Sequence, residues 1–319
     1  MTDDTTSRGP RDTQLGARAC VFTALLGGYE RLTEQAVARE SSLDFLCITD
    51  DPTLESETWT VRLVEPLFPL DPVRSQRALK IRAHATVPDY DLSLYVDNSV
   101  LLKVPPEVLL AELLPPDRGF AALAHDFRDT VADEFGAVVD AGLDTLARCD
   151  EQLAHYLELD PGCLELRPLW SGLLLRRHHE PRVVAAMELW LAHVLRYSRR
   201  DQLSVRYALR AAGVEPFEAE LDNHDSPYHH WPASAGRVPD ASLWLAEQEE
   251  LEHVRVRLVM AESALRALRA TRSWRWTSPA RGTLGRLRAA GTPQETSDSA
   301  SPVPSQAATS RYSRPRSPR

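Results

Sequence analysis

Long apolar runs are missing from this 319-residue sequence. A membrane-spanning helix needs about 18 or more consecutive apolar residues, and no stretch reaches that length. The first residues are polar and include Asp3 and Asp4, unlike the apolar segment of a secretory leader. We therefore expect a cytoplasmic protein without a spanning segment. Its content of 43% hydrophobic and 26% charged residues is typical of a globular protein.

Cysteine is scarce, and no two cysteines have the Cys-x-x-Cys spacing of zinc and redox motifs. The four cysteines are Cys20, Cys47, Cys149 and Cys163, and the first two lie within apolar runs. Buried, reduced thiols fit these positions better than metal ligands or disulfides do.

Basic charge is sparse over most of the chain. The net charge is −9, from 37 basic and 46 acidic residues. From Ser263 to Arg319, eleven arginines and two acids give +9, which leaves −18 for residues 1–262. A nucleic-acid-binding domain needs a basic face for phosphate contacts. The acidic body therefore argues against a nucleic-acid partner.

Apolar runs of strand length recur through the first two thirds of the chain. The continuous run at 19–26 predicts a central strand covered on both faces. Further strands are predicted at 43–49, 58–64, 92–96, 120–124 and 170–176. Helical periodicity fills 72–87, 128–159 with an interruption near Gly142, and 181–196. This alternation is typical of an α/β domain.

The strand at 92–96 runs directly into Asp97, Asn98 and Ser99. In an open α/β sheet the ligand crevice lies beyond the carboxyl ends of the strands. A hard cation such as Mg²⁺ or Mn²⁺ takes oxygen ligands and is completed by substrate phosphates. Asp97 can bind such a cation directly, with Asn98 or Ser99 holding a ligated water or a ribose hydroxyl. The alternative is a plain turn, because Asp and Asn both hydrogen-bond their own backbone.

Other polar residues also stand at strand ends or along one helix face. Arg74, Arg77, Lys80 and His84 recur at helical spacing, which indicates either a solvated face or a diphosphate contact by Arg77 and Lys80. Asp201 opens a predicted helix and is either an N-cap or a functional acid.

Six of these motifs occur in the order seen in a hexosyltransferase-like family, long catalogued as a domain of unknown function. That family includes plant proteins linked to mucilage polysaccharide and many bacterial proteins. The chain resembles it over about residues 19–215. The matching segments are Thr23–Tyr29, Ile48–Asp51, the Arg74/Arg77/Lys80/His84 stripe, Leu94–Asn98, His125–Asp129 and Arg200–Ser204.

The resemblance implies a glycosyltransferase of the A-type fold, a single nucleotide-binding α/β domain with a mixed central sheet. It implies a metal-binding Asp-x-Asp-like motif, with Asp97 as the acid and Mn²⁺ or Mg²⁺ as the cofactor. The residues that would face the nucleotide are Thr23, Gly28, Tyr29 and Asp50. Those that would line the donor sugar and the acceptor side are Ser171, Gly172, Asp201 and Gln202.

The sequence departs from the family pattern at Asn98 and Ser99, where a glycine followed by the amide is expected. Besides Asp97 and Asn98, we therefore consider a histidine from the end of the domain as a metal ligand. His224 is our choice, and His229 and His230 are nearby alternatives to it; a polar loop is the plain reading of all three. Arg77 or Lys80 would help to neutralise the leaving diphosphate. If the reaction inverts the sugar, Asp201 would act as the base.

The last third of the chain has a different character. Leu251, Val254, Leu258, Ala261 and Leu265 repeat at spacings of three and four, which predicts a coiled-coil helix and a homodimer. The following segment, with Trp274 and Trp276 among arginines, resembles one found after the helical part of many actinobacterial polysaccharide glycosyltransferases. It can adsorb to the inner face of an anionic membrane or dock on the acidic body.

These patterns divide the chain into five parts. We expect disorder at 1–17, the catalytic domain at 18–238, the coiled-coil helix at 239–271, the basic tryptophan and arginine segment at 272–291, and a disordered tail at 292–319. The leading hypothesis is a metal-dependent glycosyltransferase that moves a hexose from a nucleotide sugar, with UDP as the expected nucleotide, to a glycan or glycolipid. The alternatives are a nucleotide-sugar hydrolase and a noncatalytic coiled-coil scaffold.

Overall fold

The computed structural model describes residues 16–232 and five positions near the C-terminal end, namely 257, 258, 260, 261 and 263. Residues 1–251 form one compact unit and 252–319 another, and the fold and site below belong to the first. The five isolated positions are helical. The predicted homodimer contact, the membrane-binding segment and both predicted disordered ends lie almost wholly outside the described residues.

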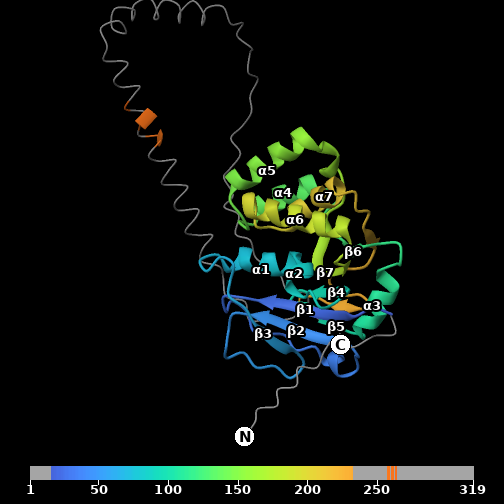
Figure 1. The fold of residues 1–319 in the computed structure, drawn as a ribbon. Coiled ribbons are helices and arrows are strands. Elements are labelled where there is room, and N and C mark those ends of the chain that lie inside the picture. The colour runs from blue at the N-terminus through green and yellow to red at the C-terminus, as the bar shows by residue number, and fades with distance from the viewer. Residues whose placement is uncertain (1–15, 233–256, 259, 262, 264–319) are drawn as a thin grey trace, which may run out of the picture. The chain divides into compact units, whose positions relative to one another are not determined.

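The architecture is an α/β domain built on a seven-stranded sheet of order β3-β2-β1-β4-β7-β6-β8 (Figure 1). The strands are β1 Ala19–Leu25, β2 Asp44–Thr49, β3 Thr60–Leu63, β4 Leu92–Val96, β6 Phe120–Ala124, β7 Leu169–Arg177 and β8 Phe217–Ala219. Strand β7 runs antiparallel to both β4 and β6, and the other pairs are parallel. The mixed central sheet predicted from the resemblance is confirmed.

The helices cover both faces of this sheet. They are α1 Pro72–Ile81, α2 Ala83–Thr86, α3 Pro106–Leu113, α4 Val131–Asp140, α5 Leu146–Leu159, α6 Pro181–Arg196 and α7 Gln202–Ala211. A small second sheet pairs β5 Leu101–Leu102 with β9 His229–His230, and short 3₁₀ helices span Ala36–Arg39 and Pro161–Cys163. In the described part of the chain, none of the helices combines the length and the apolar character that crossing a bilayer requires.

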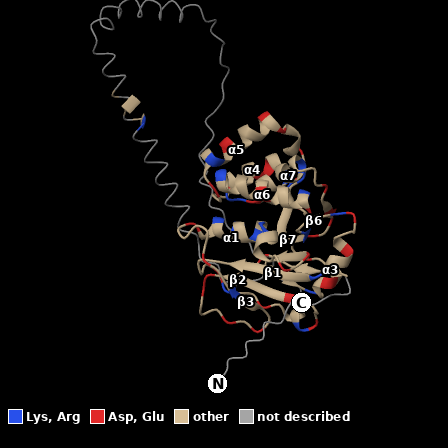
Figure 2. Cartoon of the chain, viewed as in Figure 1, with Lys and Arg blue, Asp and Glu red and all other residues tan. Residues whose placement is uncertain are grey.

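Strand β1 shows why its fully apolar sequence suits a central position. Phe22 and Ala24 enter the core beneath α1, α6 and α7, while Val21 and Leu25 enter the core that contains α3. Because successive side chains point to opposite faces, a strand buried on both sides has no polar face. Figure 2 shows the charged residues on the helices and loops, with the central strands almost free of them.

One predicted helix differs in the structure, and a predicted helix break is confirmed. The single helix expected at 72–87 is divided at Arg82, which separates α1 from α2. The helical region expected at 128–159 is interrupted as predicted, with Gly142 at φ +61° between α4 and α5. All four cysteines are buried and free, in agreement with the expectation of reduced thiols.

Candidate functional site

The candidate site is a cavity of about 270 Å³ at one edge of the sheet. Strands β4 and β6 end at this edge and the antiparallel β7 begins there, because Val96 pairs with Leu173 and Ala124 with Leu169. The cavity therefore lies where ligands bind in open α/β sheets. Its lining residues are Arg77, Lys80, Asp97, Ser99, His125, Phe127, Arg128, Glu134, Leu143, Trp170, Ser171, Gly172, Arg200, Asp201, Gln202 and Trp231.

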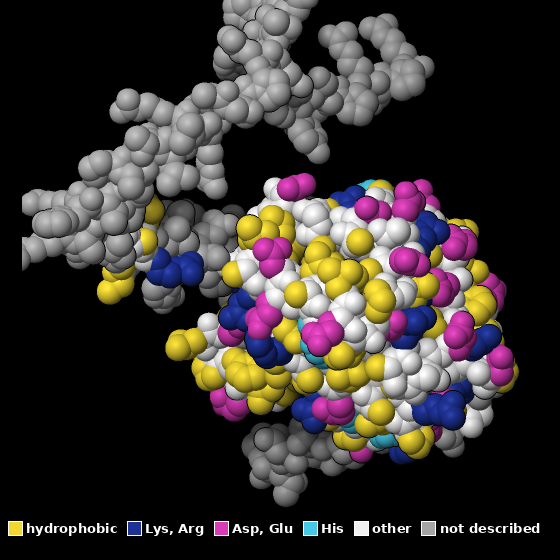
Figure 3. Space-filling view, turned by 90° about the horizontal axis from the view of Figure 1, so that it is seen from above, with side chains coloured by type: hydrophobic (Ala, Val, Ile, Leu, Met, Phe, Trp, Pro, Cys, Tyr) yellow, Lys and Arg dark blue, Asp and Glu magenta, His cyan; other side chains and the backbone are white. Residues whose placement is uncertain are grey.

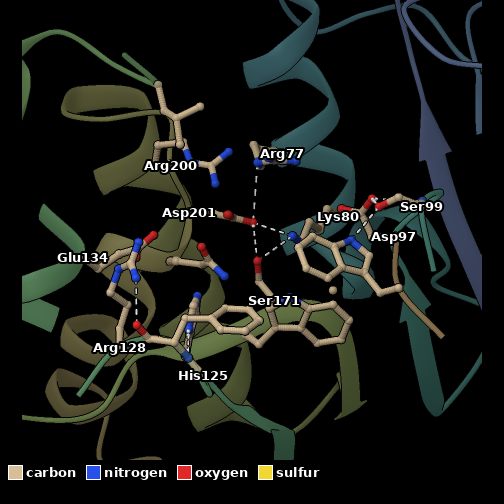
Figure 4. A pocket seen from close by; sticks show the side chains of 16 residues that line it. Arg77, Lys80, Asp97, Ser99, His125, Arg128, Glu134, Ser171, Arg200 and Asp201 are labelled. Atoms are coloured by element: carbon tan, nitrogen blue, oxygen red, sulfur yellow. Dashed lines mark hydrogen bonds and ion pairs between the residues drawn. The ribbon is translucent and has the colours of Figure 1, made fainter. Parts of the chain in front are cut away.

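Three lining residues form a closed hydrogen-bonded set at the floor of the cavity. The Lys80 Nζ lies 2.5 Å from the Asp201 Oδ2 and donates to the Ser171 Oγ at 3.0 Å. The Ser171 hydroxyl in turn donates to the same Asp201 oxygen at 3.2 Å, and the Arg77 Nε lies 3.5 Å from it. Figure 4 shows these groups converging on the Asp201 carboxylate. We call Arg77, Lys80, Ser171, Arg200 and Asp201 the cationic end.

This environment gives Asp201 a role different from the base that the sequence suggested. Burial alone would raise its pKa, but Arg77 and Lys80 hold the pKa of Asp201 well below its ordinary value. A carboxylate held in its charged form, with one oxygen already accepting from Lys80 and Ser171, is a poor proton acceptor near neutral pH. It also makes no side-chain cap to α7. Asp201 instead fixes the positions of Lys80 and Arg77.

Asp97 follows β4 directly, as predicted, and lines the cavity. Its Oδ1 accepts from the Ser99 hydroxyl at 3.1 Å and from the Ser99 backbone N–H at 3.3 Å, which is the local turn proposed as the alternative. Its backbone N–H donates to the Gly172 carbonyl at 2.8 Å. No hydrogen bond from a described residue reaches its Oδ2, so this oxygen stays available to a ligand.

Asn98, predicted as a metal ligand, does not lie in the cavity. Its side-chain oxygen accepts from the Thr33 backbone N–H at 2.8 Å, and its amide donates to the Glu30 carboxylate at 2.9 Å and to the Arg31 carbonyl at 2.8 Å. The side chain is 5% exposed. Asn98 therefore holds the 30–33 loop against the end of β4, and it turns away from Asp97.

The four residues expected to face a nucleotide do not line the cavity. Thr23 is fully buried within β1, so the structure does not support its predicted contact. Asp50 accepts from the Gly27 backbone N–H at 3.0 and 3.1 Å, which ties the end of β2 to the turn after β1. Gly28 stands exposed in that turn at φ +61°. Tyr29 is half-buried, and it is coupled electrostatically to Arg77.

The three candidate histidines also lie outside the lining. His229 is buried and both ring nitrogens are used, by the Ser226 hydroxyl at 2.7 Å and the Asn223 carbonyl at 3.0 Å, so its role is structural. His230 pairs with Asp225 at 3.2 Å. His224 packs against two lining residues, with ring centroids 4.8 Å from Phe127 and 5.1 Å from Trp231.

Sequence reasoning missed two groups of lining residues. The first comprises Arg128, Glu134 and Arg200. Glu134 is buried, which raises its pKa, although the Arg128 Nε lies 3.2 Å away. The Nε of Arg200 is buried and has no hydrogen-bond partner among the described residues. Arg200 stood beside Asp201 in a quoted motif, and that adjacency was the available signal.

The second missed group is aromatic. His125, Phe127, Trp170 and Trp231 line the same cavity, and with His224 beside them we call them the aromatic end. Phe127 was quoted within the motif after the strand at 120–124, but no role was given to it. Trp231 has no signal in the sequence, because it reaches the cavity from a loop after β8.

The oxygen ligands in the cavity suit the predicted cation only in part. Within the described residues, no group of three or more His, Cys, Asp or Glu side chains is placed to hold a metal. The cavity does offer the open Oδ2 of Asp97, with the Ser99 hydroxyl beside it. Mg²⁺ and Mn²⁺ bind through one or two carboxylates when substrate phosphates complete the shell. The residues present therefore fit a cation that arrives with a diphosphate, and not one held in a protein cage.

A second, larger cavity of about 580 Å³ lies at the other end of α7. Its arginines are already engaged, Arg206 with Glu218 at 2.5 Å and Arg210 with Asp160 at 2.7 Å. On the face of the molecule shown in Figure 3, acidic, basic and apolar side chains are mixed, and no patch carries charge of a single sign. The cavity around Asp97 is therefore the stronger candidate for chemistry.

More than half of the chain is similar to a known protein family. Residues 38–220, more than half of the chain, match the model of the TOD1/MUCI70, glycosyltransferase-like domain. The "Probable hexosyltransferase MUCI70" of Arabidopsis thaliana is 29% identical over 179 residues, which cover 54% of this chain and 30% of that protein. The chain thus spans about a third of the length of this curated relative.

Two solved structures were also similar at low scores. The WbbM bifunctional glycosyltransferase in its apo form gives a TM-score of 0.40 at 9% identity, over 67% of this chain and 40% of that one. Mouse xyloside xylosyltransferase 1, also apo, gives 0.37 at 13% identity, over 64% and 85%.

The α/β fold, the cavity at its strand ends and the family match define the class, which is a glycosyltransferase-like domain. More particularly, this chain belongs to the TOD1/MUCI70 family. The family expected from the ordered motifs is confirmed, and its matching model describes a glycosyltransferase-like domain.

Proposed function

We propose that this chain transfers a hexose from a nucleotide diphosphate sugar, with UDP as the nucleotide, to a hydroxyl of a glycan or glycolipid. The observation that carries the proposal is the pairing of an open carboxylate with buried cations in one cavity. The Asp97 Oδ2 accepts no hydrogen bond from a described residue, and Arg77 and Arg200 line the same space. A divalent cation and fixed positive charges both stabilise a diphosphate.

The transfer breaks the bond between the sugar's anomeric carbon and the diphosphate oxygen, and the electron pair leaves with the diphosphate. Stabilising that developing charge with groups already in position lowers the barrier. Arg77 is held in place by Asp201, and the Arg200 Nε has no hydrogen-bond partner among the described residues. A divalent cation on Asp97, with Ser99 beside it, would add Lewis-acid stabilisation at the same oxygens.

The new bond forms between the anomeric carbon and the acceptor oxygen, and the acceptor hydroxyl loses its proton. Among the cavity carboxylates, Glu134 is the one whose pKa is raised, through burial. A proton acceptor works best when its pKa lies near the working pH. We therefore assign to Glu134 the role that the sequence had suggested for Asp201.

The test is a thermal-shift screen of nucleotide sugars with and without Mn²⁺. A ligand at 100 times its Kd adds about 2.7 kcal/mol to the free energy of unfolding. We expect a UDP-sugar to stabilise the protein only with the cation present, and Asp97→Asn to remove that shift. Asp117→Asn is the matched control, because Asp117 is an exposed acid before β6 that lies outside the cavity lining and pairs with Arg118.

Turnover is then measured as release of the nucleotide diphosphate with and without a saccharide acceptor. Release that is independent of the acceptor would indicate the hydrolase alternative. The absence of a cation-dependent shift with any nucleotide sugar would contradict both enzymatic readings.

A further inference from the structure

Phe127 is an exposed aromatic residue on the wall of the cavity. It lies in the turn between β6 and α4 and is 43% exposed. The His125 ring meets it edge-on, with centroids 5.4 Å apart and planes at 82°, and His224 is tilted against it at 4.8 Å. The ring is thus held in one orientation by its neighbours although much of its surface faces outward. An apolar surface kept open in a cavity indicates a binding site.

Further rings extend this surface toward Asp97. Trp231 stacks on His224 at 5.1 Å and meets Trp170 edge-on at 5.7 Å. The Trp231 Nε1 donates to the Ser99 hydroxyl at 3.0 Å, and that hydroxyl donates to Asp97. The aromatic end is therefore connected by hydrogen bonds to the carboxylate proposed to hold the cation.

The loops that carry these rings are clamped together. The Asp126 backbone N–H donates to the Asn223 side chain at 3.1 Å, and the Asn223 backbone N–H donates to the Asp126 carboxylate at 2.7 Å. Asn223 also donates to the Ala124 carbonyl at 2.9 Å. A surface fixed before the ligand arrives loses less conformational entropy on binding.

Polar groups stand beside the rings. The His125 Nδ1 accepts from the Phe127 backbone N–H at 3.2 Å, so the proton of the neutral ring is on Nε2, which can donate. Burial lowers the pKa of His125 to about 4, and the ring is neutral at pH 7. The Gln202 side-chain amide also lines the cavity and makes no hydrogen bond to a described residue.

The order of the strands separates this surface from the nucleotide side. Asp50 and Gly28 follow β2 and β1, on one side of β4. On the other side, Trp170 lies in β7, and His125 and Phe127 follow β6. Asp97 comes after β4, between the two. Figure 4 shows Asp97 and Ser99 at the right of the cavity, Asp201 near the centre and His125 at the lower left.

We infer that the aromatic end is the acceptor subsite, and that it binds a pyranose ring of a glycan. One apolar C–H face of the sugar stacks on Phe127, whose ring face carries partial negative charge. His125 and Gln202 hydrogen-bond the sugar's hydroxyls. That the bound sugar is the acceptor of a transfer rests on the proposed function. Binding of a saccharide to this surface can be tested without a donor.

The first experiment compares Phe127→Ala with Phe127→Trp in steady-state transfer. Loss of the stacking face should raise the acceptor KM about tenfold, which corresponds to about 1.4 kcal/mol. The acceptor KM should rise more than the donor KM, and the tryptophan variant should keep the wild-type acceptor KM within about threefold. Leu157→Ala, which removes a 58% exposed side chain from α5, is the control outside the cavity.

The second experiment uses saturation-transfer NMR without nucleotide, with trisaccharides of glucose, galactose and mannose as probes. At least one should receive saturation from the wild type, and Phe127→Ala should reduce that transfer severalfold. If no donor is turned over but the trisaccharide signal depends on Phe127, the proposed function fails while the subsite stands. The inference is overturned if no trisaccharide binds, or if Phe127→Ala changes neither the NMR signal nor the acceptor KM.

Discussion

The two ends of the cavity are built in opposite ways. At the cationic end, side chains from α1, β7 and the start of α7 meet each other, and Lys80 and Asp201 keep only 1% and 3% of their side-chain surface exposed. At the aromatic end, the backbone N–H groups of Asp126 and Asn223 donate to each other's side chains and so clamp the loops after β6 and β8, and Phe127 keeps 43% of its surface exposed.

This difference in burial indicates that the cationic end chiefly stabilises the fold and that the aromatic end chiefly binds a ligand. A buried ion pair is costly to break, because removing one partner leaves a charge without water or counter-ion. A ring that keeps 43% of its surface exposed contributes less to folding than a fully buried one. Changes at the cationic end should therefore reduce the free energy of unfolding most, and changes to Phe127 should chiefly affect binding.

The largest effect is expected for Lys80→Met. It leaves the Asp201 carboxylate buried without its nearest cation, and should lower the free energy of unfolding by about 3–5 kcal/mol. Urea unfolding followed by circular dichroism measures this. The double variant Lys80→Met with Asp201→Asn removes both charges and should recover at least half of the loss. A single variant that costs less than about 1 kcal/mol would contradict the comparison.

Two neighbouring residues after β4, Asp97 and Asn98, should show the same contrast between an effect on activity and an effect on stability. Asp97→Asn should lower kcat/KM about 100-fold or more through loss of the cation, and it should change the free energy of unfolding by less than about 1 kcal/mol. Asn98→Ala should instead cost about 1–3 kcal/mol, because it leaves the groups of the 30–33 loop unsatisfied. Stability and turnover measured on both variants give the check. If both variants lost the same free energy of unfolding, the proposed difference between the roles of Asp97 and Asn98 would be wrong.

Much of the fold was predictable from local patterns. The apolar runs of β1 and β2 and the amphipathic helix at 181–196 depend on neighbouring residues, and α6 spans Pro181–Arg196 as expected. Asp97 was found because a strand end is visible in the sequence. Seven predicted residues meet in the cavity, namely Arg77, Lys80, Asp97, Ser171, Gly172, Asp201 and Gln202.

What the sequence could not supply is pairing over long separations. Lys80 and Ser171 are 91 positions apart, and Trp231 and Ser99 are 132 apart. No local pattern says that β7 returns antiparallel beside β4 and so brings these side chains together. The direction of Asn98 is set by the 30–33 loop, and Thr23 is buried because β1 is covered on both faces. These predictions failed because the position of each side chain depends on tertiary contacts and not on its neighbours in the sequence.

A smaller effect should follow from Gly172, which touches both ends. Its carbonyl accepts from Asp97, and a Cβ added to it would lie 2.4 Å from the Trp170 ring. Trp170 cannot move easily, since it stacks on His229 at 5.2 Å. Gly172→Ala should therefore cost about 1–3 kcal/mol through overpacking. Gly136→Ala is the matched control, because open space surrounds that position in α4, and it should be neutral or stabilising.

The smallest effect on the free energy of unfolding is expected on lowering the pH, which should affect the aromatic end and not the cationic end. The folded-state pKa of His125, about 4, lies below the usual 6.5, so the unfolded chain binds more protons between these values and stability falls as pH falls from 6.5 to 4. Asp201, with its pKa held far lower, keeps its ion pair throughout that window. His125→Asn, whose side-chain oxygen can still accept from Phe127, should reduce the loss by about 1 kcal/mol in denaturant titrations at each pH. An unchanged pH slope in this variant would mean that the aromatic end does not depend on a neutral imidazole.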